Sequence, residues 1–184
     1  MGDQLSKDIS SLKGCNKSED TILICEVWSE ATYVKHHKKK IVFIFSAMRH
    51  FAKELNESGY KVSYTKIEDK HNSGFFKSEI ARALKQQKYD QIVVTHPGEY
   101  RVEKDIKSWE TEFKISVEIR ADDRFLCSPE DFAIWAKDRK QLRMEYFYRE
   151  MRKKYNVLME GNQPIGGQWN YDLKNRKPPQ KNLL

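Results

Sequence analysis

The sequence lacks long hydrophobic runs and an N-terminal apolar stretch resembling a signal peptide. No run of about 18 apolar residues occurs among its 184 residues, so we expect no membrane-spanning segment. The first residues, MGDQLSKDISSL, lack the apolar core of a signal peptide, which favours a cytoplasmic location. With 39% hydrophobic and 33% charged residues, the chain is polar but long enough for one domain with a core.

Cysteine is also scarce, and its spacing excludes several kinds of site. Cys15, Cys25 and Cys127 form no C-x-x-C pair, and an odd count without a leader predicts reduced thiols. Cys25 lies in an apolar run, where we expect a small buried side chain. The sequence has no Walker loop, G-x-G-x-x-G, G-x-S-x-G or H-E-x-x-H motif, which argues against a conventional hydrolase or dehydrogenase.

Positive charge is in excess. The formal net charge is +7, which favours contact with a polyanion such as nucleic acid. The alternative is that many soluble proteins of this size are mildly basic without binding nucleic acid. Charge alone leaves both interpretations open.

Short apolar strands alternate with amphipathic helices along the first two thirds of the chain. The pattern predicts strands at residues 21–27, 61–67, 91–95 and 116–119. It predicts helices at 38–58 and 102–113, and between them a helix with Phe76, Ile80, Ala83 and Leu84 on one face. Gly59 is expected to end the first helix in a left-handed conformation. This alternation predicts an α/β fold, a doubly wound, Rossmann-like parallel sheet with helices on both faces.

The alternation stops after Arg120. Ser128 and Pro129 have the character of a helix start, a second helix is expected at 141–159, and the Gly- and Pro-rich remainder predicts an irregular linker. We therefore expect an α/β domain at 1–127, a helical extension at 128–159 and a linker at 160–184.

The beginning of the chain is unusual for such a fold. A doubly wound domain opens with an apolar strand that leads into its first ligand-binding turn, and here the turn-like Gly2, Asp3 and Gln4 stand without that strand. The pattern predicts a truncated chain or a misassigned start, with a central strand lost from the sheet. An open sheet edge of that kind favours a homodimer.

Two segments are candidates for a ligand site at the carboxyl edge of the sheet. Gly2-Asp3-Gln4 offers a carboxylate and an amide to ligand hydroxyls, although an ordinary turn has the same composition. After the first strand, Glu30 or Glu26 is placed to accept hydrogen bonds from a heterocycle, and Tyr33 to stack on it. The alternative is a helix start with acids that favour its dipole.

Three further segments are rich in cations. Residues 35–40 (KHHKKK) suit a solvated face or a phosphate contact better than a metal, because adjacent histidines diverge and lysines repel a divalent ion. Residues 139–155 interleave cations with aromatics, as expected for a packed helix or one that follows a phosphate backbone. In residues 166–178, Asp172 and Asn175 offer oxygens to a divalent cation such as Mg²⁺, and Arg176 and Lys177 suit phosphate. The alternative is that the whole segment docks on a following domain.

Several of these stretches together resemble one family. They are GDQL at residues 2–5, EVWSEATYVKHHKKKIVFIFSAMRHFA at 26–52, HPGEYR at 96–101, DDRF at 122–125, RKQLRMEYFYREM at 139–151 and GGQWNYDLKNRKP at 166–178. The chain is similar to the N-terminal region of the deoxyribodipyrimidine photolyase-related proteins, a group that includes iron–sulfur bacterial cryptochromes and prokaryotic (6-4) photolyases.

The resemblance implies an antenna domain of a larger DNA repair protein. Family members join an α/β domain, which can bind 6,7-dimethyl-8-ribityllumazine, to a helical domain that binds FAD and a [4Fe-4S] cluster. By position, the resemblance implies that Gly2, Asp3 and Gln4 face the ribityl chain and that Glu30 holds the ring. It places Tyr33 and Ile44 in the same pocket.

The resemblance also implies roles near DNA. It associates Asp172 with a divalent cation, and it is compatible with Arg176 and Lys177 contacting nucleic acid. The FAD and cluster ligands would belong to a C-terminal domain outside this chain, so we expect no light-driven repair by the chain alone. The alternative function is a stand-alone, non-enzymatic α/β module that binds a small ligand or nucleic acid.

Overall fold

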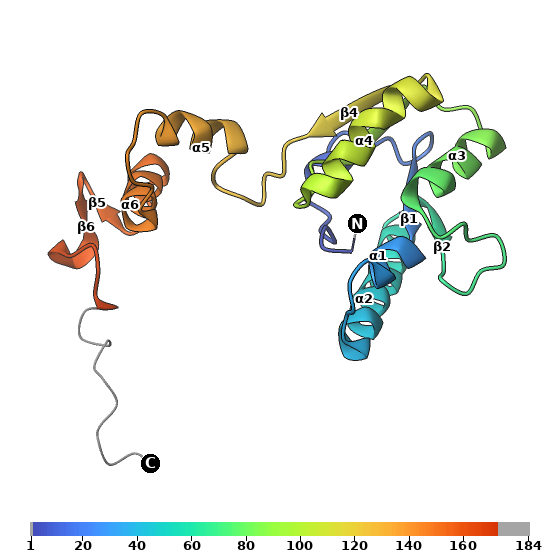
Figure 1. Cartoon of the computed structure of the whole chain (residues 1–184), viewed down its shortest axis with the longest axis horizontal. Coiled ribbons are helices and arrows are strands. Elements are labelled where there is room, and N and C mark those ends of the chain that lie inside the picture. The colour runs from blue at the N-terminus through green and yellow to red at the C-terminus, as the bar shows by residue number, and fades with distance from the viewer. Residues whose placement is uncertain (1, 173–184) are drawn as a thin grey trace, which may run out of the picture. The chain divides into compact units, whose positions relative to one another are not determined.

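The chain forms two compact units, residues 1–124 and residues 125–184 (Figure 1). The computed structural model describes residues 2–172. Within that range, no helix is both long enough and apolar enough to cross a membrane. Each unit is taken by itself below.

The first unit contains four parallel strands arranged in two pairs. The strands are β1 (Thr21–Cys25), β2 (Lys61–Thr65), β3 (Gln91–Thr95) and β4 (Ser116–Arg120). β1 pairs with β2 in the register Thr21 to Lys61, and β3 pairs with β4 in the register Gln91 to Ser116. The predicted α/β class and parallel strands are confirmed, with the strands joined as two separate pairs among the described residues.

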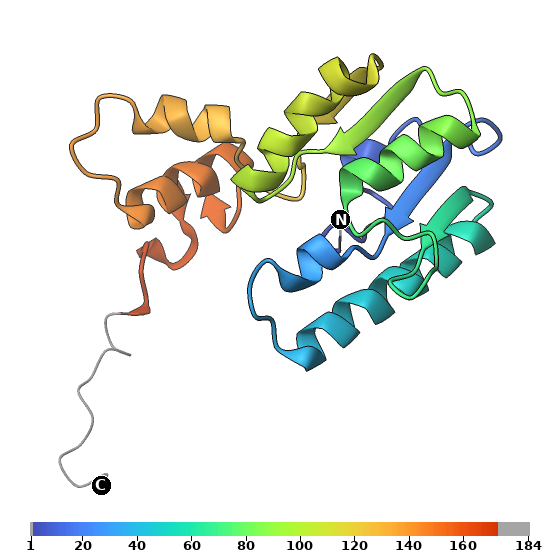
Figure 2. The same ribbon diagram turned by 45° about the vertical axis from the view of Figure 1, so that its right-hand side comes forward.

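Helices connect and cover these strands. They are α1 (Trp28–Thr32), α2 (Lys38–Glu57), α3 (Phe76–Gln86) and α4 (Tyr100–Phe113), preceded by the 3-10 turn η1 (Ser10–Leu12). Figures 1 and 2 show α2 alongside the β1–β2 pair and α4 alongside the β3–β4 pair, and these helices contact β2 and β4 respectively. Gly59 has a φ of 86° after α2, so the predicted left-handed helix end is confirmed.

The hydrophobic core of the first unit lies where α4 packs on the β3–β4 pair. Val102, Ile106 and Trp109 are spaced along one face of α4 and are buried against apolar residues of α3, β3 and β4. On the other side of the unit, Met48, Ala52 and Leu55 form the buried stripe of α2. By contrast, the central residues of β1 and β3 are only half-buried, because each strand has one paired neighbour among the described residues.

The second unit is a small helical unit with a hairpin. It contains α5 (Pro129–Ala136), α6 (Met144–Tyr155), the antiparallel strands β5 (Met159–Glu160) and β6 (Gln163–Pro164), and the turn η2 (Ile165–Gly167). The Ser128 hydroxyl accepts a hydrogen bond from the Asp131 N–H at 3.0 Å, so the predicted helix start is confirmed. The expected helix at 141–159 is shorter than predicted, because Asn156 takes a left-handed conformation with φ 53°.

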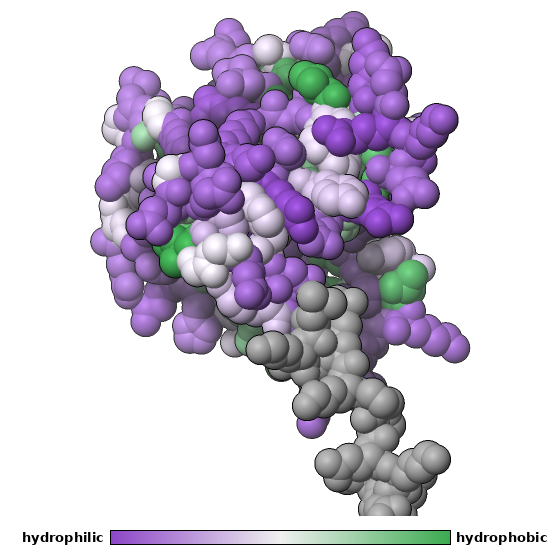
Figure 3. All heavy atoms as spheres, turned by 90° about the vertical axis from the view of Figure 1, so that its left-hand side faces the viewer, coloured by the Kyte–Doolittle hydropathy of each residue, from purple (hydrophilic) through white to green (hydrophobic). Residues whose placement is uncertain are grey.

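Aromatic and cationic side chains hold this second unit together. Phe147 packs edge-on against Phe132 and Trp135, with ring centroids 5.3 and 5.0 Å apart. Three cations of α6 surround the Trp169 ring at 5.3–5.6 Å; they are Arg149, Arg152 and Lys153. Phe147 of α6 therefore packs within the unit and the cations of α6 hold the segment that follows, whereas Tyr146, Tyr148 and Tyr155 are exposed. The face turned to the viewer in Figure 3 is mainly hydrophilic, with small separate hydrophobic areas.

Candidate ligand pocket

A cavity of about 280 Å³ opens where β1 and β3 end. We call it the edge cavity. Five of the six predicted cofactor-binding residues line it: Gly2, Asp3, Glu30, Tyr33 and Ile44. They come from the start of the chain, from α1 and its end, and from α2. Residues more than 40 positions apart therefore meet at the carboxyl edge of the strands. Open α/β folds bind their ligands at this edge.

One wall of the edge cavity is apolar. Ile41, Ile44, Phe45 and Met48 project from α2, and Val102 projects from α4. Gly2 approaches this wall so closely that a Cβ at its position would lie 2.6 Å from the Ile44 Cγ2 atom. A side chain there would fit only if Ile44 moved, so close packing favours glycine at this position.

Gln4, the sixth predicted residue, lies outside the cavity lining. Its side chain is buried, and its amide donates a hydrogen bond to the His96 carbonyl at 3.0 Å. Nearby, the Ser10 and Thr95 hydroxyls are 3.0 Å apart, and the Ser11 N–H donates to the Thr95 hydroxyl at 3.0 Å. These hydrogen bonds attach the N-terminal segment to the end of β3. Gln4 therefore positions the neighbouring Asp3 at the cavity without lining the cavity itself.

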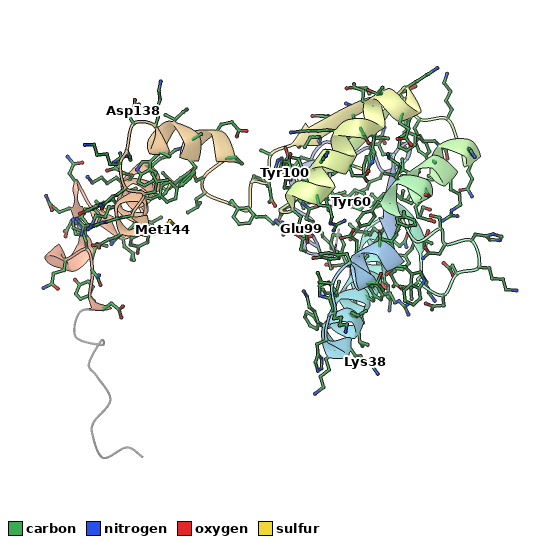
Figure 4. All side chains as sticks on the ribbon, in the orientation of Figure 1. Lys38, Tyr60, Glu99, Tyr100, Asp138 and Met144 are labelled. Carbon is green, nitrogen blue, oxygen red and sulfur yellow. The ribbon has the colours of Figure 1, made fainter. Side chains whose placement is uncertain are left out.

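The polar side of the edge cavity contains Glu30 and Glu99, and both carboxylates bind Arg101. Arg101 donates to the two Glu30 oxygens at 3.0 and 2.8 Å and to Glu99 at 3.1 Å. The Tyr33 hydroxyl donates to the other Glu99 oxygen at 3.2 Å. Figure 4 shows Glu99 and Tyr100 at the start of α4. Desolvation and the neighbouring Glu99 carboxylate raise the pKa of Tyr33 above its ordinary value.

Two basic side chains, His36 and Lys40, also line the edge cavity. His36 packs edge-on against Tyr33, with ring centroids 5.3 Å apart. His37 instead caps α2, because its Nδ1 atom accepts a hydrogen bond from the Lys39 N–H at 3.1 Å. The two histidines thus have separate roles, and in the part of the chain that the structure describes no three His, Cys, Asp or Glu side chains gather as metal ligands.

Glu26, the alternative acceptor for a heterocycle, does not line the edge cavity and binds other groups of the protein instead. Its side chain is 0% exposed, and its oxygens accept hydrogen bonds from Arg49 at 2.6 and 2.7 Å and from the Ile67 N–H at 2.9 Å. Burial alone would raise the pKa of Glu26, but hydrogen bonds from Arg49, Tyr64 and Ile67 outweigh it and hold the pKa below its usual value. Glu26 is therefore a structural carboxylate.

A second buried carboxylate, Glu79, was not anticipated from the sequence. It accepts hydrogen bonds from the Ser73 N–H at 2.7 Å and from the Thr65 hydroxyl at 3.1 Å, and it pairs with Arg82. Its place on the amphipathic helix α3 gave no signal, because an acid in the first helical turn is ordinarily an exposed favourable charge.

The remaining predicted site residues fall at positions 172–177. The Asp172 N–H donates to the Asn170 side chain at 2.7 Å, which forms a local turn. Asn175, Arg176 and Lys177 lie outside the described residues. The three cysteines are free thiols, and Cys25 is buried and lines the edge cavity. Burial raises the pKa of Cys25 to about 12.

Comparison with known proteins gives the relationships of the chain. The family described as deoxyribodipyrimidine photo-lyase-related protein matches residues 1–184. A (6-4) photolyase of Agrobacterium fabrum is 54% identical over 184 residues, which are 100% of this chain and 36% of that protein. An uncharacterised protein of Acanthamoeba polyphaga mimivirus is 22% identical over 149 residues, 79% of this chain and 74% of the viral protein. The chain thus spans about a third of the photolyase's length.

Proposed function

Because this chain belongs to the deoxyribodipyrimidine photo-lyase-related protein family, we propose that it is the N-terminal, light-harvesting domain of a photolyase-related DNA repair protein or cryptochrome. The observation that carries the proposal is the edge cavity, where Asp3, Glu30 and Tyr33 face an apolar wall at the ends of two parallel strands. Such a mixture of apolar surface and a few convergent polar groups is typical of small-ligand sites.

The edge cavity suits a ribityl-substituted bicyclic ring such as 6,7-dimethyl-8-ribityllumazine. Its volume of about 280 Å³ is near the lower end of small-ligand pockets, about 300 Å³, and favours a compact ligand over a dinucleotide. In this proposal, Glu30 accepts hydrogen bonds from the ring, Asp3 accepts them from the ribityl hydroxyls, and the α2 wall covers the ring face. The chemistry that such a chromophore supplies is absorption of violet to blue light for transfer to a flavin.

The flavin, a [4Fe-4S] cluster and most DNA contacts are assigned in this proposal to a C-terminal domain beyond this chain. The three free cysteines, Cys15, Cys25 and Cys127, form no C-x-x-C pair, and the described residues contain no cluster of three metal-ligating side chains. For the second unit, we propose a Mg²⁺ contact at Asp172 and phosphate contacts at Arg176 and Lys177. The proposed location is the cytoplasm.

Absorbance of the purified protein tests the antenna role. We expect a near-ultraviolet to violet band, either as purified or after lumazine is added, that is released on denaturation. Glu30→Ala should weaken lumazine binding about 10- to 100-fold without unfolding the chain, because it removes charge-assisted hydrogen bonds of about 1.5–3 kcal/mol. If the protein carries no such band after incubation with lumazine and removal of the free ligand, the antenna role is refuted.

Glu103→Ala is the matched control for Glu30→Ala. Glu103 is 20% exposed and pairs with Lys107 on α4, whereas Glu30 is 26% exposed and pairs with Arg101. Glu103 does not line the edge cavity, so its loss should leave lumazine affinity unchanged. Equal weakening by both variants would show a general effect of charge and contradict the assignment of Glu30.

A stand-alone binding module is the second candidate function. The observation in its favour is the viral relative, of which the matched region makes up 74%, so the similar region accounts for most of that protein. The basic composition favours nucleic acid as its ligand. A colourless protein whose DNA affinity falls steeply with salt would support this function, because phosphate contacts release counterions.

A further inference from the structure

Four side chains form a closed set of contacts at the rim of the edge cavity. This rim cluster consists of Glu30, Tyr33, Glu99 and Arg101. Arg101 binds both Glu30 oxygens and one Glu99 oxygen, Glu99 accepts a hydrogen bond from Tyr33, and the guanidinium carbon lies 4.5 Å from the Tyr33 ring centroid. Each member therefore contacts at least one other through a polar or cation–π interaction.

The rim cluster joins two parts of the unit that follow different strand pairs. Glu30 and Tyr33 come from α1 and its end, directly after β1, whereas Glu99 and Arg101 come from the start of α4, directly after β3. Among the described residues, β1 and β3 are hydrogen-bonded to β2 and β4 and not to each other. Arg101 is thus a side-chain link across the carboxyl edge at which the cavity opens.

Glu30 stands between two cavities, and Arg101 lies on one side of it. A second cavity of about 400 Å³ is lined by Arg101 together with Glu30 and Tyr33. The edge cavity is lined by Glu30 and Tyr33 but not by Arg101. Each carboxylate oxygen can accept two hydrogen bonds, so the two bonds from Arg101 leave acceptor capacity on Glu30 for a group in the edge cavity.

We propose that Arg101 is the positioning residue that makes Glu30 a fixed acceptor, so that the edge cavity selects rings that carry an N–H donor. This inference rests on the proposed function. A free glutamate must lose rotamer freedom when it binds a ligand, and the two-pronged guanidinium contact imposes that order beforehand. Arg101 offers only donors, so it cannot compete with Glu30 for the ligand's N–H group.

The test compares two ligands in four variants. The probes are 6,7-dimethyl-8-ribityllumazine and its derivative methylated on the pyrimidine-ring nitrogen that otherwise carries the N–H. The variants are Arg101→Met, Glu30→Ala, their double mutant and the control Lys107→Met, which removes the cation of the neighbouring Glu103 pair on α4. Dissociation constants are measured by fluorescence titration.

We expect Arg101→Met to weaken binding of the lumazine about tenfold, within the range of couplings between contacting residues. The methylated derivative should bind the parent and Arg101→Met alike, because it presents no donor to Glu30. The double mutant should bind no more weakly than Glu30→Ala, since Arg101 acts through Glu30, and Lys107→Met should match the parent. Equal lumazine affinity of Arg101→Met and the parent, with a loss in Glu30→Ala, would overturn the role of Arg101 and leave the proposed function standing.

A ligand-free measurement separates failure of the proposed function from failure of this inference. The Arg101 charge opposes the rise in the pKa of Tyr33, so Arg101→Met should shift the Tyr33 titration to higher pH, with Tyr33→Phe identifying the signal. Lys107→Met should cause no such shift. If the parent binds neither probe, the proposed function fails. Independently of ligand binding, an unshifted Tyr33 titration in Arg101→Met would show that Arg101 does not organise the rim cluster.

Discussion

Glu26→Gln is expected to destabilise the first unit strongly, although Glu26 lies outside the edge cavity. The carboxylate is 0% exposed and accepts hydrogen bonds from Arg49, the Tyr64 hydroxyl and the Ile67 N–H. A glutamine amide keeps one acceptor oxygen and turns an N–H₂ donor toward groups that are themselves donors. The substitution therefore removes the charge and leaves buried donors facing another donor.

The expected loss is about 3 kcal/mol in the free energy of unfolding. Breaking a buried ion pair costs about 3–5 kcal/mol, and the lower end applies because Arg49 is 40% exposed and keeps a second carboxylate, Glu68, at 3.0 Å. An unsatisfied Ile67 N–H or Tyr64 hydroxyl costs about 1–3 kcal/mol, and this cost is contained in the figure for the broken pair and is not added to it. A loss of this size is a large fraction of a typical stability of about 5–15 kcal/mol.

Glu68→Gln is the matched control. It removes a carboxylate bound to the same guanidinium, but Glu68 is 57% exposed, so its loss should cost no more than about 1 kcal/mol. Urea unfolding followed by circular dichroism at neutral pH measures both variants. If the two variants lose equal stability, burial of Glu26 is not the source of its contribution, and the argument is refuted.

The same carboxylate predicts a pH dependence. The pKa of folded Glu26 lies below its ordinary value of 4.5, so the folded protein binds the Glu26 proton less readily than the unfolded chain. Its contribution is therefore fully present above the unfolded pKa and is lost as pH falls through the lower, folded pKa. The gap in stability between the parent and Glu26→Gln should narrow on acidification, and a gap that widens would contradict the sign.

Two further predictions concern single side chains. Cys25 should react with a thiol reagent at least about tenfold more slowly in the folded protein than in urea, because burial raises its pKa to about 12 and little thiolate forms; equal rates would contradict this. Lys114→Gly should stabilise the protein by about 0.5 kcal/mol, because Lys114 ends α4 with φ 53°, whereas Lys104→Gly within α4 should cost about 1 kcal/mol. Thermal unfolding measures the stability of both glycine variants, and a loss of stability in Lys114→Gly would contradict the prediction for Lys114.

Periodicity predicted the regular elements well because their apolar spacing is local information. The strand at 91–95 is confirmed at both ends, and the helix expected at 38–58 ends within one residue of the observed α2. The helix expected at 141–159 was too long at both ends. At its C-terminal end, the left-handed Asn156 allows the Arg152 guanidinium to bind the Val157 carbonyl, a tertiary choice that helical spacing does not encode.

The site was harder to predict than the fold because its polar contacts join distant segments. Resemblance placed Glu30 and Asp3 together, but Arg101 stands 71 positions from Glu30, and its pairing depends on how α1 and α4 meet. Spacing likewise did not distinguish Glu26 from Glu30, since both follow β1 by a few residues. The structure separates them by burial: Glu26 points into hydrogen-bond donors, and Glu30 lines the cavity.

The loop between β2 and α3 deserves to be treated as a structural element rather than as a variable connection. Ile67 donates its N–H to the Glu26 carboxylate, Asn72 donates to the Glu26 carbonyl at 2.6 Å, and Ser73 donates to Glu79. The Gly74 carbonyl then accepts the N–H of Ser29, the residue before Glu30. Because α1 is too short to be stable alone, the orientation of Glu30 depends on this loop.

Surface loops ordinarily accept insertions and sequence drift. An insertion at residues 66–74 would instead affect the edge cavity through backbone contacts, because none of these residues lines it. Homologues of altered length in this loop should therefore differ in ligand preference even when Asp3, Glu30 and Tyr33 are retained.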